Sequence, residues 1–403
     1  MERFGRIPED VVVEILSWLP AESLMRFKCV RKSWYALFKN PEFVAKQESN
    51  QIQCIKTSNK PTILLMESLF SDSQFHLILQ SYSNTRLAAS KAKSDKVSVA
   101  VKRMKIANDD ENVPFLDVAG YCNGLIFLYS HWSSDIILVN PAIREFRHLP
   151  VSCIPTPPQA FEDVPDFVEV CRLPEVGFGY DLKADDYKVV MIWSFYDAYK
   201  HSSWEAHPRP SPVEVYTLSS DSWTQINDYH PHKKNLLFLF QRCFNGVLYW
   251  LDGLKTEPDA LEPRPAIAAF DLSQQVFQWM PMPVSFKFWN DTSRSLVVLN
   301  ESLALFDCRG GDQRVFDLWV MEDEFGVNGT WCKILSIGPL EGIAKPLVFW
   351  GTDELLLGND NKEVVSYDLT TKQIKNHLHT HYTSKFVFAD IYLSNLLSLK
   401  RAN

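Results

Sequence analysis

Three histidines alternate near the end of the sequence, at His377, His379 and His381. Imidazole is a common ligand of zinc and copper, so this spacing is the first candidate for metal chemistry. Alternate residues of a strand stand about 7 Å apart, however, which is too far for three in a row to reach one ion without a bend. No acidic or thiolate side chain is close in sequence. We therefore expect a solvent-facing outer strand and no bound metal.

The other motifs do not indicate catalysis or a cofactor. Gly177-Phe178-Gly179 begins like a dinucleotide-binding fingerprint, but Leu182 occupies the place of the third glycine, so we interpret the segment as a turn. The sequence contains no phosphate-binding loop, zinc-peptidase or serine-hydrolase motif. Its eight cysteines are scattered and form no C-x-x-C pair, which argues against a disulfide framework or a zinc site. We expect no catalytic residues and no cofactor.

Composition and charge exclude further classes. The chain has 403 residues, of which 46% are apolar and 22% charged, so it can bury a sizeable core. A net charge of -8 argues against a protein held to nucleic acid by phosphate contacts. No apolar run is long enough to span a bilayer, and the acidic residues near the start do not suit a signal peptide. We expect a chain that acts in the cytoplasm, or also in the nucleus.

Residues 1–47 differ in pattern from the rest. Apolar side chains recur at Ile7, Val11, Ile15 and Leu19, a four-residue step typical of a helix. Two further short helices are predicted between Ala21 and Phe38. Three helices in so few residues cannot bury all their apolar side chains among themselves. The surplus stripe is therefore expected to meet another protein.

This segment resembles an F-box domain, with Ile7 where leucine is usual. The matching residues are Ile7-Pro8-Glu9-Asp10, Ile15-Leu16, Leu19-Pro20, Leu24, Phe27, Val30, Trp34 and Phe43. The resemblance implies docking onto a Skp-type adaptor, and through it onto a cullin and a RING protein. The contact residues that it implies are Pro8, Ile15, Leu19, Pro20, Leu24, Val30 and Trp34. The alternative is that the stripe is only the internal core of a small helical domain.

Residues 48–60 are mostly polar and are predicted to be a linker, after which residues 61–403 read as short strands. A strand, turn and strand unit recurs about every 50 residues, the period of a kelch-like β-propeller. The repeated units are anchored at Asn140, Thr217, Asp271, Met321 and Asp368. With the strands between Pro61 and Val118, they predict six blades. The fold class is thus mainly β, with a three-helix F-box before the propeller, and the C-terminal strands are expected to close the ring against the first blade.

The second part also resembles a known domain. Asn140 to Pro150, Gly177 to Asp181 and Asp186 to Val190 are similar to the plant F-box-associated domain. Within it, Arg294 to Asn300 and Ile337 to Leu340 resemble pollen S-locus F-box and S-locus F-box-like proteins. The resemblance implies a non-catalytic substrate receptor of a ubiquitin ligase. Its target would be a non-self S-RNase of the self-incompatibility response, ubiquitinated for proteasomal degradation in the pollen tube cytosol.

Three loops have compositions suited to protein recognition, because they mix acidic and aromatic side chains. The candidate target-binding residues in them are Glu162, Asp163, Asp166, Tyr199, Trp204, Arg209, Glu257 and Asp259. Residues 1–47 carry a net charge of +2, so the rest of the chain carries -10. Such a charge favours encounter with a basic partner, as an S-RNase would be.

Two other functions remain open from the sequence. The first is a receptor of the same architecture that serves another plant protein, unrelated to self-incompatibility, and differs only in its loops. The second is a propeller enzyme, which would need polar residues converging at the centre of the ring. No acid, histidine or cysteine repeats at inward-pointing positions, so the sequence favours the receptor.

Overall fold

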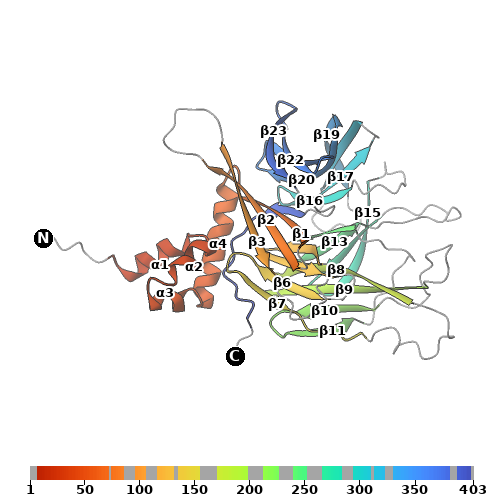
Figure 1. Cartoon of the computed structure of the whole chain (residues 1–403). Helices are drawn as coiled ribbons and strands as arrows, with labels where there is room; N and C mark the ends of the chain where they lie inside the picture. The colour runs from red at the N-terminus through yellow and green to blue at the C-terminus, as the bar shows by residue number, and fades with distance from the viewer. Residues whose placement is uncertain are drawn as a thin grey trace, which may run out of the picture.

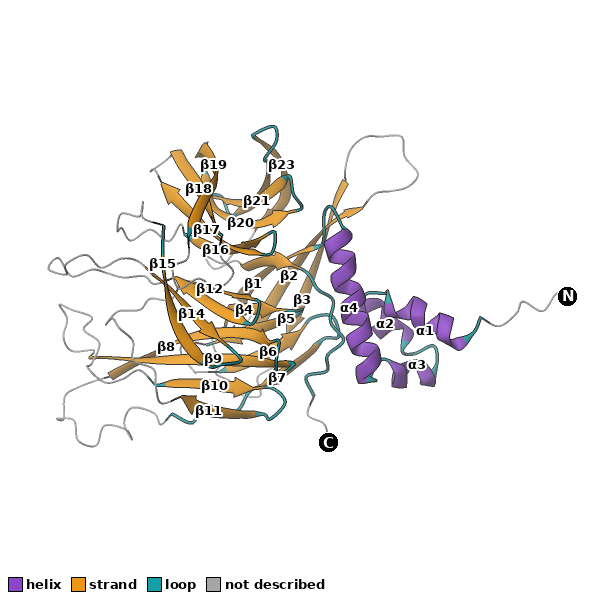
Figure 2. Ribbon diagram, turned by 180° about the vertical axis from the view of Figure 1, so that it is seen from behind, coloured by secondary structure: helices purple, strands orange, loops and turns teal. Residues whose placement is uncertain are grey.

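The computed structural model consists of a helical module attached to one face of a ring of β-sheets (Figure 1). The residues that it describes are 7–71, 74–85, 96–105, 116–130, 135–154, 170–197, 212–226, 239–251, 266–283, 294–309, 313–322, 330–381 and 388–400. The helices are α1 (Glu9–Ser17), α2 (Ala21–Phe27), α3 (Lys32–Leu37) and α4 (Pro41–Thr57). Figure 2 shows α4 along the boundary between the other helices and the strands. The expected order of a helical domain before a β-propeller is confirmed.

The predicted three helices are followed by a fourth. Asn40-Pro41 ends the preceding helical stretch, as expected, but it also begins α4: the Asn40 side chain accepts a hydrogen bond from the Glu42 amide at 2.8 Å, and Pro41 occupies the first turn. Most of the polar segment predicted as a linker, 48–60, belongs to this helix. The two domains are therefore connected by a helix up to Thr57.

Six four-stranded antiparallel sheets form the ring, which confirms the predicted number of blades. The first blade contains β24 (Phe388–Ile391), β1 (Ile63–Ser71), β2 (Gln74–Thr85) and β3 (Lys96–Lys105). The second contains β4 (Asp117–Cys122), β5 (Leu125–Tyr129), β6 (Ile136–Asn140) and β7 (Glu145–His148). The third contains β8 (Val170–Asp181), β9 (Asp186–Asp197), β10 (Val213–Thr217) and β11 (Ser222–Ile226). The remaining three blades follow the same order from the centre outward.

The fourth blade contains β12 (Leu239–Phe244), β13 (Val247–Leu251), β14 (Ala266–Asp271) and β15 (Val276–Pro281). The fifth contains β16 (Ser295–Leu299), β17 (Ser302–Arg309), β18 (Gln313–Met321) and β19 (Trp331–Glu341). The sixth contains β20 (Ile343–Trp350), β21 (Glu354–Asn359), β22 (Glu363–Asp368) and β23 (Gln373–His381). The inner strands β24, β4, β8, β12, β16 and β20 contact one another in this order around the centre.

The ring is closed by the chain ends of the propeller. Strand β24 pairs antiparallel with β1, so the last strand completes the first blade, as predicted. The second strand of each blade is buried along most of its described length, and apolar clusters continue from one blade to the next. This closure leaves no open edge between the first and last blades.

The repeated strand, turn and strand pattern is also confirmed. Each repeat is the outer hairpin of a blade, where the large side chain that opens the fourth strand faces a residue of the third. Examples are Val139 opposite Phe146, Tyr216 opposite Trp223 and Phe270 opposite Phe277. The Asn-Gly pairs after β4 and β12 form tight hairpin turns, with positive φ at both residues of each pair.

One segment predicted to be a turn is part of a strand instead. Gly177-Phe178-Gly179 lies inside β8, and its glycines are required by close packing: a Cβ on Gly177 would lie 2.4 Å from the Trp250 ring of the next blade. Among the described residues, no helix is long and apolar enough to cross a membrane.

Candidate functional site

Helix α1 has apolar side chains on two faces. Leu16 is buried in the helical core, where Val12 and Val13 also pack. Ile7, before the helix, and Ile15 within it are 61% and 53% exposed. The helical repeat places Val11 and Trp18 on the same outer stripe, because residues three or four apart share a face. One face of α1 thus stabilises the module, and no described residue of the chain covers the other face.

The corner between α2 and α3 extends the uncovered surface. Phe27 is partly exposed and packs edge-on against Trp34, with ring centroids 6.2 Å apart. Val30 is 66% exposed. Arg31 forms an ion pair with Glu9 of α1 at 3.1 Å, which connects this corner to the start of α1. We name the six exposed residues the outer apolar face: Ile7, Val11, Ile15, Trp18, Phe27 and Val30.

The seven residues expected to contact an adaptor divide into three groups. Pro8, Ile15, Pro20 and Val30 are exposed, and Leu19 and Trp34 are half-buried, with part of each side chain in the helical core. Leu24 is fully buried in that core, so its expected direct contact is corrected: it supports the surface from inside. Motif spacing identified the positions but could not distinguish inward from outward side chains. Val11, Trp18 and Phe27 also belong to this surface. The apolar periodicity of the segment is the sequence signal that indicates them.

The module is held to the propeller by the segment Tyr392–Lys400, which we call the C-terminal strap. The Ser394 hydroxyl accepts a hydrogen bond from the Ala21 amide at 2.7 Å and donates one to the Glu22 carboxylate at 2.7 Å. Tyr392 also hydrogen-bonds Glu22. The buried Gln47 amide of α4 donates to the Leu19 carbonyl at 3.1 Å and to the strap. Helices α2 and α4 are thereby tied to the C-terminal strap.

The strap also forms hydrogen bonds with the propeller. Asn140 donates to the carbonyls of Asn395 and Leu397 at 3.1 and 2.9 Å, and Asn395 donates to the carbonyl of Asn123 at 2.8 Å. Leu396 packs with Ala142 of the second blade inside the helical core. One short segment therefore contacts both domains, and the outer apolar face has a fixed orientation relative to the ring.

A serine to alanine change tests this junction. Ser394→Ala leaves the buried Ala21 amide without its acceptor, and we expect a loss of about 1–3 kcal/mol in the free energy of unfolding of the helical module. Ser398→Ala is the matched control, because its bond to Glu145 is exposed. Urea unfolding followed by tryptophan fluorescence measures both. Equal stability of the two variants would contradict the role of the strap.

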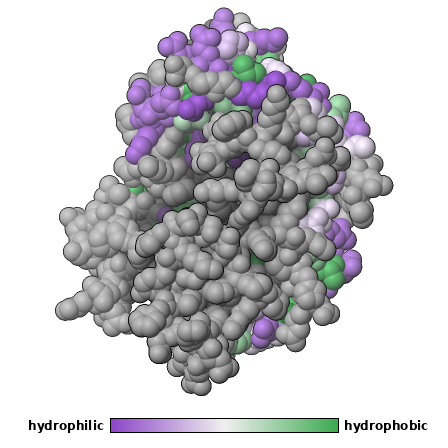
Figure 3. Space-filling view, turned by 90° about the vertical axis from the view of Figure 1, so that its right-hand side faces the viewer, coloured by the Kyte–Doolittle hydropathy of each residue, from purple (hydrophilic) through white to green (hydrophobic). Residues whose placement is uncertain are grey.

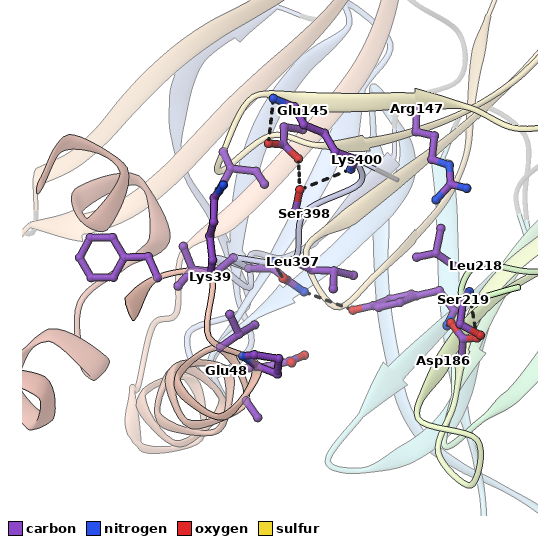
Figure 4. Close-up of a pocket in the computed structure, with 18 of the residues that line it drawn as sticks. Lys39, Glu48, Glu145, Arg147, Asp186, Leu218, Ser219, Leu397, Ser398 and Lys400 are labelled. Carbon is purple, nitrogen blue, oxygen red and sulfur yellow. Dashed lines mark hydrogen bonds and ion pairs between the residues drawn. The ribbon is translucent and has the colours of Figure 1, made fainter. Parts of the chain in front are cut away.

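A cavity of about 1100 Å³ lies where α2, α3 and α4 face the strap and the turns of the second and third blades (Figure 4). Its wall has charges of both signs. Glu145 accepts from the Ser398 hydroxyl at 2.8 Å, Asp186 accepts from the Ser219 amide at 3.1 Å, and Arg147 pairs with Asp221 at 2.5 Å. Burial, with the neighbouring charge of Asp185, raises the pKa of Glu48 on α4. These bonds hold turns and strap together, and they form no nucleophile–base pair.

The candidate target-binding residues lie outside the described part of the chain: Glu162, Asp163, Asp166, Tyr199, Trp204, Arg209, Glu257 and Asp259. The strand ends that flank them are described. The β6–β7, β8–β9 and β10–β11 turns lie beside the strap and the cavity. Successive strands of a blade run antiparallel, so the end of β9 and the start of β10, which flank residues 198–211, lie on the opposite face of the ring. Figure 3 views the molecule from that side.

The alternating histidines belong to β23, which is the outermost strand of the sixth blade, as expected for that segment. Within the ranges that the structure describes, no three histidine, cysteine, aspartate or glutamate side chains are grouped so as to hold a metal ion.

The structure thus combines a helical module that has an exposed apolar face with a six-bladed propeller, and the strap bonds to both. The comparisons with known proteins identify its family. Residues 4–46 match the F-box domain and residues 61–395 match the F-box associated beta propeller domain, so the chain belongs to the F-box proteins that carry this propeller.

Relatives from Arabidopsis thaliana agree with this membership. F-box protein CPR1 is 28% identical over 383 residues, which cover 91% of this chain and 83% of CPR1. F-box/kelch-repeat protein At3g17530 is 27% identical over 374 residues, covering 91% of this chain and 84% of that protein. Each similarity covers more of the chain than the propeller alone, so both include at least part of the helical module.

Proposed function

We propose that this protein is the substrate receptor of a ubiquitin ligase of the SCF type, which is assembled from a Skp-type adaptor, a cullin, a RING protein and an F-box protein. The observation that carries the proposal is the outer apolar face, whose Ile15 and Val30 are large apolar side chains that remain exposed in the described part of the chain. Contiguous exposed apolar surface of this kind marks a protein interface. Membership of the F-box family supports a Skp-type adaptor as the partner that covers this face.

The proposed mechanism is proximity rather than catalysis by this chain. The adaptor surface and the opposite face of the ring are held in one orientation by α4 and the strap. A target bound at the far face would be presented to the ubiquitin-charged enzyme carried by the cullin. Holding lysine and thioester together raises their effective concentration, so the receptor needs no nucleophile or base.

The target is proposed to be a basic protein. Residues 48–403 carry a net charge of -10, and the candidate loops 152–175 and 254–265 are acidic. The negative charge of this chain would accelerate its encounter with a positively charged protein and disfavour the binding of acidic proteins. The narrower proposal, a non-self S-RNase recognised in the pollen tube, rests on the resemblance of residues 24–29, 32–34, 294–300 and 337–340 to S-locus F-box proteins. A receptor for another plant protein differs from it only in the target.

Affinity purification of the full-length chain from plant tissue, with identification of partners by mass spectrometry, tests the proposal. We expect a Skp-type adaptor and cullin together with a target that accumulates when the proteasome is inhibited. Recovery of the target without the adaptor would contradict the ligase assignment. A panel of S-RNases tests the narrower target, since allele-independent or absent binding would leave only the general receptor. The proposed location is the cytoplasm or nucleus, where these partners act.

Charge reversal tests the predicted target loops. The triple change Glu162→Lys, Asp163→Lys, Asp166→Lys should weaken capture of a basic target about tenfold or more at low salt, because opposite charges are replaced by like charges. Adaptor binding should be unchanged. A matched triple reversal in the sixth blade controls for net charge: Asp353 in the β20–β21 turn, Asp360 in the β21–β22 turn and Glu363 at the start of β22. If both variants lose the same affinity, overall charge and not these loops recognises the target.

A further inference from the structure

The cavity between the helical module and the ring is large enough to hold a ligand. Its volume of about 1100 Å³ is at the upper end of the range of about 300–1,000 Å³ that ligand pockets occupy. On the helical side, α4 contributes Pro41, Val44, Ala45 and Glu48 to its wall. These positions are spaced i, i+3, i+4 and i+7, so they share one face of the helix. The other walls are the strap and the turns of the second and third blades.

Most charged side chains of the ring and the strap that line the cavity already have partners. Arg147 pairs with Asp221, and Lys400 lies 3.7 Å from the Glu145 carboxylate. Asp186 accepts hydrogen bonds from two backbone amides, at 2.8 and 3.1 Å. These groups contribute little net charge to the cavity.

The charges on the helical wall are different. Among the described residues, Glu48 has neither a hydrogen-bond nor an ion-pair partner, and no carboxylate pairs with Lys28 or Lys39. The Lys39 ammonium lies 4.3 Å from the centre of the Tyr35 ring. Burial and the charge of Asp185 raise the pKa of Glu48, and no cation of the chain opposes this shift. The wall thus presents one uncompensated acid and two uncompensated bases.

The acid and the bases are separated along α4. Lys39 lies two residues before Pro41, where the helix begins, and Glu48 lies two turns further along. At 1.5 Å per residue, the seven positions from Pro41 to Glu48 span about 10 Å. Figure 4 shows Lys39 and Glu48 on the helical side of the cavity. A ligand that satisfies both ends needs a cationic and an anionic group about 10 Å apart, which is the length of about three extended residues.

Apolar side chains line the cavity between these charges. They come from α4, the β6–β7 turn, the end of β10 and the strap: Val44, Ile143, Leu218 and Leu396. Such a wall favours an apolar group in the middle of the ligand. A carboxylate beside apolar side chains suits an ammonium group better than a metal ion, which takes several oxygen ligands.

We propose that this cavity binds a free peptide of about three residues with an apolar central side chain. The ammonium group of the peptide pairs with Glu48, its carboxylate pairs with Lys39, and its central side chain packs against the strap and the turns of the ring. Both pairs are charge-assisted hydrogen bonds. The bound peptide contacts the helical module and the propeller together. The site is separate from the outer apolar face, so the proposal does not rest on the ubiquitin-ligase function.

Isothermal titration calorimetry of the full-length protein with the tripeptide Gly-Leu-Gly tests the proposal. Acetylation of the peptide removes its ammonium group, and amidation removes its carboxylate. Each blocked peptide should bind at least about tenfold more weakly than the free peptide, because one charged hydrogen bond is lost. Gly-Ser-Gly should also bind more weakly, since its central side chain is polar.

Two variants assign each charge of the protein to one end of the ligand. Glu48→Gln should bind the free and acetylated peptides equally, and Lys39→Gln should bind the free and amidated peptides equally. Glu42→Gln, at an exposed position of α4 outside the cavity, is the matched control and should bind all four peptides like the wild type. If a variant does not fold, hydrogen–deuterium exchange of the wild type replaces it. The free peptide should then slow exchange in α4 and the strap.

Three results would overturn the proposal. One is the absence of any heat of binding at peptide concentrations up to about 5 mM, a range that would detect even weak association. Another is a blocked peptide that binds as tightly as the free one, which would leave a site for a simple cation or anion. The third is slower exchange only in parts of the chain other than α4 and the strap.

Discussion

Aspartate in place of Ile15 or Val30 is expected to abolish binding of a Skp-type adaptor while the protein remains folded. Both side chains are more than half exposed in the free chain, so the change should alter the free energy of unfolding by less than about 0.5 kcal/mol. In the complex, the same carboxylate would be buried against apolar surface without a partner. The cost of burying an unpaired charge predicts a dissociation constant at least about 100-fold higher.

Two further variants separate contact from support. Val151→Asp, at a propeller residue that is 89% exposed, adds the same charge elsewhere and should leave adaptor affinity unchanged. Leu24→Ala removes a fully buried side chain and should cost about 2–5 kcal/mol of stability in the helical module. Isothermal titration calorimetry and thermal unfolding of all four variants measure both effects. Undiminished affinity of Ile15→Asp would place the adaptor elsewhere.

Replacement of Arg242 is expected to have the largest effect on the stability of the propeller. Its guanidinium crosses the centre of the ring from β12: it donates to the Leu296 carbonyl of β16 at 2.9 Å and pairs with Asp390 of β24 at 2.6 Å. It also lies 4.7 Å from the centre of the Phe388 ring. Three blades are thus connected through one side chain.

Arg242→Met keeps most of the volume but leaves the Asp390 carboxylate without its counter-ion. Because Asp390 retains 32% side-chain exposure, we expect a loss of about 2–4 kcal/mol and not the full cost of an isolated buried charge. The double variant Arg242→Met, Asp390→Asn should recover part of this loss, since it removes the unpaired charge. Urea unfolding of the single and double variants measures the coupling. Additive losses would show that the pair does not interact.

The same variant should change the dependence of stability on pH. Burial raises the pKa of Asp390 above its ordinary value of 3.8, and Arg242 opposes this shift. Without Arg242 the folded-state pKa should rise further, so the folded protein binds a proton that the unfolded chain has released. In Arg242→Met the contribution of Asp390 to stability should therefore be fully present below about pH 4 and be lost as the pH rises through its folded-state pKa. Asp390→Asn should remove that dependence, and urea unfolding at several pH values tests it.

The propeller could be predicted from the sequence because the residues that determine each hairpin lie close together in the chain. Turn residues such as Asp271 and the Asn-Gly pairs fix hairpins, and the large residue that opens each outer strand, such as Phe277, pairs with a residue only a few positions away. The repetition of these units predicted the number of blades. Closure by the last strands followed from the need to pair an open edge.

Other features depend on contacts that no local pattern contains. The strap joins Ser394 to Ala21 across 373 residues, and neither residue belongs to a motif. The F-box motif located Leu24 and Ile15 equally well, but only packing shows that one is core and the other is surface. Gly177 and Gly179 suggested a turn because glycine is common in turns, whereas here they accommodate side chains of the next blade.

The central claim is that the outer apolar face is completed by an adaptor. Hydrogen–deuterium exchange on the full-length chain, alone and with a saturating Skp-type adaptor, tests it most directly. We predict slower exchange in α1 and in the segment from Phe27 to Arg31, with exchange in β23 and the outer hairpins unchanged. Protection confined to the propeller, or no protection in α1 at saturation, would contradict the account.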